Sequence, residues 1–372
     1  MFVSELELKN FRNFKDFKMK LHNNLNIIIG ENAQGKTNLL ESIYVSCFGK
    51  SFRTRNDKDL ILNNDGIMYN YAKLSIKKRH TEITVEYRIH KQLNKEIKIN
   101  NNSIKKLSEI LGNIYVVLFS PEDLELVKGS PSIRRDFINR ELSNINLKYC
   151  GLLIEYKKIL KQRNNILKND SINNQMLEIF TDQLIEKGVQ IIIYRIDFIN
   201  KINKISHKIH GDLTKQKENL VVEYLSNISL ENGKNYDKIE ESYRKKIKSK
   251  IEREKRLGYT LVGPHRDDFN LFINNQEVKQ FGSQGQQRTA ALSLKLSEIE
   301  LIKNETNEYP ILLLDDVFSE LDLQRQGSLL KIFEKTQTII TSTSFDEVLK
   351  NKAKDYKLIK IKNGKSVGGL YE

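Results

Sequence analysis

Residues 30 to 37 read Gly30-Glu31-Asn32-Ala33-Gln34-Gly35-Lys36-Thr37, which fits the pattern G-x-x-x-x-G-K-[ST]. The apolar run Leu25–Ile29 precedes this stretch, and apolar residues at helical spacing follow it from Asn38 to Phe48. A strand, a glycine-containing turn and a helix in this order let backbone N–H groups surround a phosphate at the positive end of the helix dipole. We therefore predict a nucleotide-phosphate loop, with Lys36 on the β- and γ-phosphates and the Thr37 hydroxyl on Mg²⁺.

A second signal lies near the other end of the chain, where the apolar run Ile311–Leu314 ends in Asp315 and Asp316. A carboxylate at the end of a buried strand beside a phosphate loop holds Mg²⁺, and we assign that role to Asp315. A second carboxylate can polarise the attacking water, and we assign that role to Asp316. Strand ends often carry aspartate, so this pattern alone is weak evidence. Together with the phosphate loop it is strong evidence for a nucleotide site.

Three further polar segments have both a functional and an ordinary structural interpretation. Ser283-Gln284-Gly285-Gln286 precedes a predicted helix, where a hydroxyl and backbone amides can bind an anion but serine is also a favoured helix cap. Ser319-Glu320-Leu321-Asp322 follows the paired aspartates and fits a surface turn equally well. Thr341, in Thr341-Ser342-Thr343 at a predicted strand end, is either a sensor of the γ-phosphate or an ordinary polar strand end.

The composition favours a polyanionic partner. The 372 residues include 62 Lys and Arg against 48 Asp and Glu, a net charge of +14 that suits nucleic acid, although the many Lys, Ile and Asn could also reflect a genome's base composition. The basic segment Arg244–Arg256 includes Lys245, Lys246, Lys248 and Lys250, candidates for nucleic-acid contact whose alternative is a solvated helix face. No apolar run reaches the ~18 residues of a membrane-spanning helix. Two cysteines exclude a disulfide-rich scaffold and a four-cysteine zinc site.

The order of elements along the chain predicts a split domain. Strand and helix patterns alternate in the first and last thirds, whereas Leu147–Lys168 and Met176–His210 carry apolar residues at helical spacing and predict a long helical hairpin. We predict an α/β fold in which a P-loop ATPase head, residues 1–125 and 258–372, is split by an inserted helical arm domain, residues 126–257.

This order of motifs resembles that of ABC-type ATPase heads, and in particular the SMC-like branch, whose head is split by an insertion. Longer strings resemble the RecF family of bacterial DNA replication and repair proteins, namely Pro121–Asn139, Leu257–Asp268 and Leu314–Leu330. The resemblance runs from Asn10 to Thr343, nearly the whole chain. Asn139 stands where that family usually has Asp, and the signature is Ser-Gln-Gly-Gln rather than Leu-Ser-Gly-Gly-Gln.

The resemblance implies a head-to-tail dimer that encloses ATP and Mg²⁺. The phosphate loop of one protomer would hold the nucleotide, and the segment Ser283–Gln286 of the other would cap its γ-phosphate. Ser319–Asp322 would lie at the dimer seam, and Arg12 would be a further phosphate sensor. Asp316 is shorter than the Glu that many ABC relatives carry, which favours slow turnover. The resemblance thus implies a slow, DNA-stimulated ATPase used as a switch.

The implied role is an ATP-switched dimeric clamp on gapped DNA or single-strand/double-strand junctions. Such a clamp would act in recombinational repair and replication, promote recombinase loading with RecO and RecR, and support the SOS response, in a nucleoid-associated, cytoplasmic setting without a membrane partner. Two other classes remain open. An ABC transporter subunit predicts Leu-Ser-Gly-Gly-Gln and a late histidine, and both are missing. An SMC-like structural chromosome ATPase predicts hundreds of residues of heptad insertion, more than the interval between the two Walker motifs provides.

Overall fold

The structure is a computed structural model that describes residues 1–63, 67–78, 81–90, 95–169, 171–230, 233–318, 321–344 and 355–371. The chain divides into two compact units, Met1–Pro121 with Ile302–Glu372 and, between them, Glu122–Leu301. These units differ from the predicted domains in two segments, residues 122–125 and 258–301, which are compact with the helical part of the chain. The assignment of residues 1–125 and 258–372 to a head and 126–257 to an insertion concerns functional domains and stays a prediction.

An antiparallel sheet of six strands, in the order β2-β1-β4-β5-β6-β7, forms one layer of the first unit. Its strands are β1 (Phe2–Phe11), β2 (Phe14–Lys20), β4 (Tyr69–Lys78), β5 (Thr81–His90), β6 (Glu96–Ile99) and β7 (Asn102–Ser103). Along β5 the side chains of Val85, Tyr87 and Ile89 are buried and their neighbours are more exposed. Because successive side chains of a strand point to opposite faces, this alternation makes β5 a half-buried strand.

A second sheet of six strands has the order β15-β14-β3-β13-β12-β8 and is parallel except for β15. Its strands are β3 (Leu25–Ile29), β8 (Val116–Phe119), β12 (Ile311–Asp315), β13 (Thr338–Ser342), β14 (Tyr356–Lys362) and β15 (Lys365–Tyr371). All residues of β8, β12 and β13 are buried, as expected for parallel strands covered on both faces. The strands β3 and β12, which precede the loop and the paired aspartates, are separated by β13 alone.

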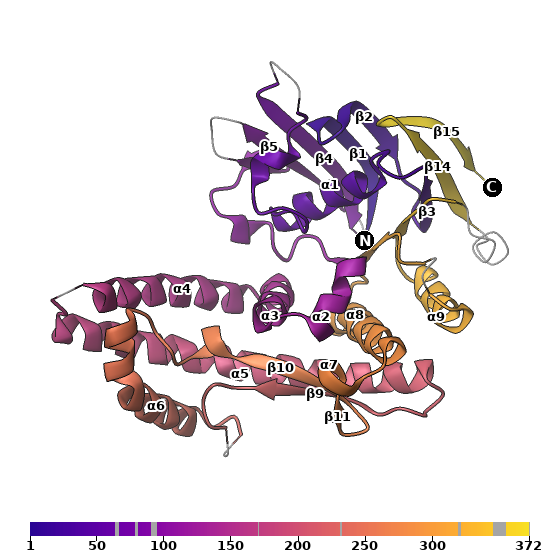
Figure 1. Cartoon of the computed structure of the whole chain (residues 1–372). Helices are drawn as coiled ribbons and strands as arrows, with labels where there is room; N and C mark the ends of the chain where they lie inside the picture. The colour runs from indigo at the N-terminus through magenta and orange to yellow at the C-terminus, as the bar shows by residue number, and fades with distance from the viewer. Residues whose placement is uncertain are drawn as a thin grey trace. The chain divides into compact units, whose positions relative to one another are not determined.

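Helix α1 (Lys36–Phe48) packs against strands of both sheets, and Figure 1 shows it beside β4 and β5. Almost every residue of α1 is buried, which fits a helix with apolar contacts on all sides. The remaining elements of this unit are η1 (Asp57–Leu60), η2 (Leu107–Glu109), the start of η3 (Pro121–Leu124) and α9 (Leu323–Phe333). The predicted order of strand, loop and buried helix around residues 25–48 is confirmed.

The second unit is built on a long helical hairpin, α4 (Leu147–Lys168) and the 40-residue α5 (Asn174–Leu213). A short antiparallel sheet, β9-β10-β11, lies along α5, as Figure 1 shows. The other elements are α2 (Glu125–Lys128), α3 (Pro131–Ile145), β9 (Leu220–Leu225), α6 (Tyr236–Leu257), η4 (Pro264–Arg266), β10 (Asp268–Ile273), β11 (Gln276–Glu277), α7 (Val278–Phe281) and α8 (Gln284–Thr306). The predicted hairpin is confirmed, whereas β9 was not predicted.

His265 holds the loop after α6 against the helical hairpin. Its Nδ1 lies 2.7 Å from the Tyr156 hydroxyl, and its Nε2 lies 3.2 Å from the Thr260 carbonyl oxygen. A carbonyl can only accept, so Nε2 carries the proton and Nδ1 accepts from the tyrosine. Burial lowers the pKa of His265 to about 4, so the ring stays neutral near pH 7. Its role is therefore structural.

Candidate nucleotide-binding site

The phosphate loop connects β3 to α1, and its backbone needs glycine at two places. Gly35 has φ +107°, and a Cβ on it would lie 2.5 Å from the Asn13 side chain. A Cβ on Gly30 would lie 2.5 Å from the Ile361 carbonyl oxygen. The loop is thus packed between the β1–β2 turn and the end of β14, and a side chain at either position would displace it.

Replacing Gly35 by alanine is expected to distort the loop. The substitution combines a positive φ with the contact to Asn13, and a strained residue of this kind costs on the order of 1–3 kcal/mol. We expect Gly35→Ala to lower both the thermal midpoint of unfolding and the affinity for ATP. Gly151→Ala is the matched control, since a Cβ on Gly151 in α4 would meet no other atom within 4 Å. A Gly35→Ala variant with parental stability and ATP affinity would contradict this view of the loop.

Lys36 lies across the loop that precedes it. Its Nζ donates to the carbonyl oxygens of Gly30 at 2.6 Å and Glu31 at 3.2 Å, and only 4% of the residue is exposed. These two bonds fold the ammonium group back over the start of the loop. A cation at this position adds a point charge to a concave array of backbone donors, as phosphate recognition requires.

Thr37 and Asp315, 278 residues apart in the chain, meet at the ends of their elements. The Thr37 hydroxyl donates to Asp315 Oδ1 at 2.8 Å, and Asp315 is 7% exposed. A hydroxyl and a carboxylate are the oxygen ligands that Mg²⁺ takes, with phosphate oxygens and water completing the octahedron. Within the part of the chain that the structure describes, no group of three or more His, Cys, Asp and Glu side chains could hold a metal alone. The donor set therefore fits a cation that arrives with a phosphate.

Thr341 on β13 organises both aspartates from the strand next to them. Its hydroxyl lies 2.8 Å from Asp315 Oδ1 and accepts the backbone N–H of Asp316 at 3.1 Å. Asp316 has φ +53°, a left-handed conformation that Asp and Asn tolerate better than most residues. The turn after β12 thus directs Asp316 away from the strand direction. The predicted sensor role of Thr341 stays a prediction, and its hydroxyl contacts both aspartates and the Leu314 carbonyl oxygen in the structure.

Arg12 lies at the β1–β2 turn and is held by a buried acid that the sequence analysis did not single out. Its guanidinium pairs with both oxygens of Glu41 on α1 at 2.7 and 2.8 Å, and its Nη1 donates to the Asp59 carbonyl oxygen at 2.8 Å. Glu41 is completely buried. A charged residue inside an apolar helix pattern is the signal that could have revealed this pair. The role of Arg12 as a phosphate sensor stays a prediction.

The segment Ser283–Gln286 begins α8 in the second unit. Ser283 Oγ accepts the backbone N–H of Gln286 at 3.2 Å, and Gln286 Oε1 accepts the N–H of Ser283 at 2.9 Å. This reciprocal pair is a capping box, so the helix-cap interpretation is correct. The anion-binding interpretation remains compatible with it, because a hydroxyl that accepts one bond still has a proton to donate. The first turn of α8 contains no acidic residue to repel an anion.

The predicted seam segment is only partly described. Ser319 and Glu320 lie outside the described residues, and Leu321 and Asp322 lead into α9. Asp322 caps this helix by accepting the backbone N–H of Arg325 at 2.9 Å. The cap fixes the direction in which the chain leaves the turn after the paired aspartates.

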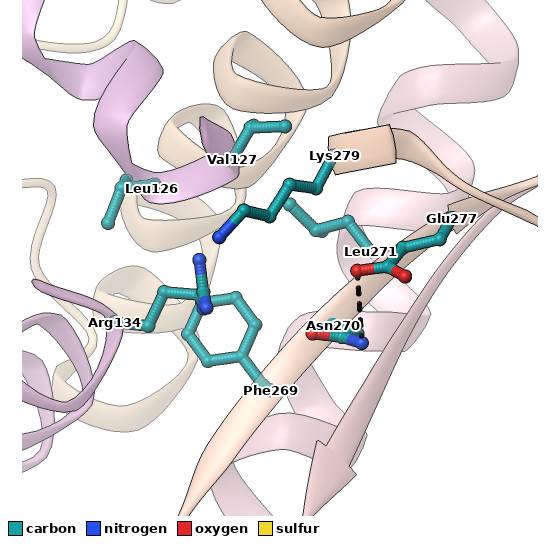
Figure 2. Close-up of a pocket in the computed structure, with 8 residues that line it drawn as sticks. All are labelled: Leu126, Val127, Arg134, Phe269, Asn270, Leu271, Glu277 and Lys279. Atoms are coloured by element: carbon teal, nitrogen blue, oxygen red, sulfur yellow. Dashed lines mark hydrogen bonds between the residues drawn. The ribbon is translucent and has the colours of Figure 1, made fainter. Parts of the chain in front are cut away.

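A small pocket in the second unit lies apart from these motifs along the sequence. Figure 2 shows the Lys279 ammonium and the Arg134 guanidinium reaching toward one place, beside Phe269 and the hydrogen-bonded pair Asn270 and Glu277. Both cations donate to the carbonyl oxygen of residue 129 at 3.0 Å. They therefore hold the turn between α2 and α3 in place, and the pocket contains none of the predicted site residues.

Comparison with known proteins assigns the family. Residues 2–367 match the family described as "RecF/RecN/SMC N terminal domain". The chain is 45% identical over 364 residues to the DNA replication and repair protein RecF of Alkaliphilus oremlandii, covering 98% of this chain and 99% of that one. The chain belongs to the RecF family. A solved structure of "the recombination mediator protein RecF-ATP in RecFOR pathway" is similar to it with a TM-score of 0.91 at 35% identity, covering 100% of this chain and 97% of that one.

The RecF-family fold is that of an SMC head. A Pyrococcus furiosus Smc head matches with a TM-score of 0.56 at 16% identity, covering 100% of this chain and 96% of that one, and at this identity the match shows the fold alone. The predicted fold class, an ABC/SMC-like ATPase head split by an inserted helical arm, is thereby confirmed. The described residues include no helix with the length and apolar character needed to cross a membrane.

Proposed function

We propose that this RecF-family protein is an ATP-switched DNA clamp of recombinational repair and replication. The observation that carries the proposal is the 2.8 Å hydrogen bond between Thr37 and Asp315, which joins the phosphate loop to the strand-end carboxylate. ATP with Mg²⁺ fits this pair, since a hydroxyl and a carboxylate are oxygen ligands that would hold the metal beside the phosphate loop. A relative of the chain was solved with ATP, which supports the same ligand.

The roles of the side chains follow from their chemistry. The loop residues Gly30–Thr37 bind the phosphates through backbone N–H groups, and Lys36 adds charge at the β- and γ-phosphates. Thr37 and Asp315 would hold Mg²⁺, which would supply charge stabilisation for phosphoryl transfer. Asp316 orients the attacking water as general base. Its short side chain gives slow turnover, suited to a switch rather than a metabolic ATPase.

The second half of the site comes from another copy of the chain. The start of α8 carries a serine hydroxyl and the positive end of a helix dipole, which together suit a γ-phosphate. The loop and α8 belong to different compact units, and each offers one side of a phosphate site. In a head-to-tail dimer, two nucleotides bridge two subunits with Asp322 at the seam, so ATP drives association by mass action. Hydrolysis removes the γ-phosphate and opens the dimer.

Gapped DNA or a single-strand/double-strand junction is the polyanion that the clamp would hold. The net charge of +14 supports phosphate contacts, which make binding sensitive to salt. On α6, Lys245 and Lys248 are exposed, whereas Lys246 donates to the Asn227 carbonyl oxygen. The solved relative is described as a mediator in the RecFOR pathway, which supports RecO and RecR as partners in recombinase loading. The same setting supports a link to the SOS response and a cytoplasmic, nucleoid-associated location.

Mixing two inactive variants tests whether the site is shared between copies. Lys36→Met removes the cation of the phosphate loop, and Ser283→Arg prevents the start of α8 from contacting the γ-phosphate. Ser249→Arg, on the exposed side of α6, is the control. A head-to-tail mixed dimer has one intact site. An equimolar mixture should therefore recover ATPase activity that neither variant has alone, because each mixed dimer has one working site. Mixed dimers detected by energy transfer without any recovered activity would contradict the shared site.

A further inference from the structure

The signature glutamine is held from outside its own helix. Gln286 Nε2 donates to Glu218 Oε1 at 3.0 Å, and Glu218 lies between α5 and β9, 68 residues away. The other oxygen of Glu218 lies 3.0 Å from Nε2 of His210, in the last turn of α5. His210 Nδ1 lies 3.0 Å from the Ser293 hydroxyl, which returns to α8. The four side chains therefore form a relay that joins the start of α8 to the end of α5.

The relay is hydrogen-bonded at each step and largely buried. The Ser293 hydroxyl lies 2.7 Å from the Thr289 carbonyl oxygen and 3.0 Å from His210 Nδ1, so it joins the relay to the backbone of α8. His210 Nε2 lies 3.0 Å from Glu218 Oε2, and a carboxylate oxygen can only accept, so Nε2 donates. His210 is completely buried and Glu218 is 22% exposed, so losing Glu218 would leave a buried polar atom without this hydrogen bond, which is costly.

The relay fixes the amide that caps the signature serine. Gln286 Oε1 accepts the Ser283 N–H at 2.9 Å while its Nε2 donates to Glu218, so both ends of the amide are engaged. Rotating the Gln286 side chain would break both bonds at once. Glu218 therefore determines the side-chain conformation on which the Ser283–Gln286 capping box depends.

A cluster of exposed lysines lies on the same short stretch of chain as Glu218. Three of them follow each other at helical spacing on one face of α5, and two lie in the turn that leads to Glu218. This lysine cluster consists of Lys201, Lys204, Lys208, Lys215 and Lys217. Lysines within 17 positions of one another on an exposed helix end present a dense positive charge, which attracts a phosphate backbone.

We propose that Glu218 is a positioning residue for the signature segment and that, through His210, it couples that segment to the lysine cluster, which binds the phosphate backbone of nucleic acid. The proposal rests on the proposed function, because it needs Ser283 to cap a nucleotide held by a second copy. Nucleic acid on the lysine cluster and a γ-phosphate at Ser283 then favour the same arrangement of α5 and α8. Such coupling is reciprocal, so ATP strengthens DNA binding as much as DNA strengthens capping.

Glu218→Ala and Glu218→Gln test the positioning role in the full-length protein. We expect Glu218→Ala to raise the ATP-dependent dimer dissociation constant about 10-fold, since it removes a hydrogen bond to a charged acceptor. Glu218→Gln keeps an acceptor for Gln286 and should recover part of the loss. Affinity of the monomer for a fluorescent ATP analogue should stay parental, because the phosphate loop is in the other unit. Glu223→Ala, on the exposed side of β9, is the matched control.

Fluorescence anisotropy with a labelled gapped duplex tests the coupling. In the parental protein the affinity with ATP should exceed that with ADP, and Glu218→Ala should bring this ratio close to one. A double variant, Lys204→Gln with Lys208→Gln, should instead lower affinity in both states and reduce the salt dependence by about two units of slope. Equal loss in both states for Glu218→Ala would show that it has no coupling role.

The outcomes separate this proposal from the one on which it rests. If the parental protein does not dimerise with ATP, the proposed function fails before Glu218 is tested. If the parental protein dimerises and both Glu218 variants match it, the positioning role is wrong and the clamp stands. If Glu218→Ala does not fold, Glu218→Gln carries the test, and a parental dimer dissociation constant for that variant overturns the proposal.

Discussion

Lys36→Met is expected to abolish ATP-dependent dimerisation while leaving the fold intact. The side chain is almost entirely buried over the loop, and methionine has a similar length and suits that apolar stem. What disappears is the ammonium charge, and with it contacts to the β- and γ-phosphates that the loop amides alone do not replace. Loss of hydrogen bonds to a charged group predicts ATP binding weaker by ~10- to 100-fold in titration calorimetry.

The control for this variant is Lys50→Met, at an exposed position just beyond α1. It removes the same charge from the same unit without touching the loop, so it separates a local effect from one of net charge. The circular dichroism spectrum and thermal midpoint of Lys36→Met should stay near the parental values. Parental ATP affinity in Lys36→Met would refute the phosphate loop as the nucleotide site.

Asp316→Asn is expected to keep ATP binding and lose turnover, which traps the dimer. Asn tolerates the left-handed backbone at this position as well as Asp does, so the turn after β12 survives the change. An amide cannot accept a proton from the attacking water, and loss of a general base lowers the rate by at least ~100-fold. Single-turnover hydrolysis and gel filtration with ATP would show slow chemistry together with a long-lived dimer.

Asp16→Asn provides the comparison, since Asp16 is an exposed carboxylate on β2, away from the end of β12. Its rate should equal the parental rate. If Asp316→Asn hydrolyses ATP as fast as the parental protein, Asp316 does not activate water, and that role passes to another group.

The fold could be predicted where local pattern and tertiary context agree. The loop at residues 30–37 was recognised by its residue pattern and the strands around it by their apolar runs. The hairpin of α4 and α5 was recognised by apolar residues at helical spacing. Strand β9 was missed because its pairing partner is β10, with Leu220 opposite Ile273. Such long-range pairing leaves no local signal. The same pairing places β10 in one compact unit with the helical part of the chain.

The residues of the candidate site could be predicted from the sequence, but the side chains that hold them in place could not. The loop and the paired aspartates were identified by residue type and order, and the structure brings Thr37 to Asp315. The side chain that packs on Gly35 was not identified. Asn13 donates to the Gln34 carbonyl oxygen at 3.0 Å and accepts from Asn38 at 2.9 Å. A single polar residue in a turn carries no periodic signal, so contacts of this kind appear only once the chain is folded.

Thr341 shows what register adds to sequence order. It lies opposite Asp315 in the parallel pairing of β12 with β13, which is why one hydroxyl can reach both aspartates. The sequence placed a polar group at that strand end but could not say which strand would lie beside β12. Strand order is a property of the whole sheet, and the strand between β3 and β12 comes late in the chain.

Sedimentation velocity with ATP, ADP or no nucleotide, each with and without gapped duplex DNA, tests the central claim most directly. The clamp predicts a monomer without nucleotide and with ADP, and a dimer with ATP. That dimer should bind the gapped duplex in a salt-dependent manner. A protein that binds ATP yet sediments as a monomer under every condition would contradict the claim, because Ser283 would then have no nucleotide of a second copy to cap.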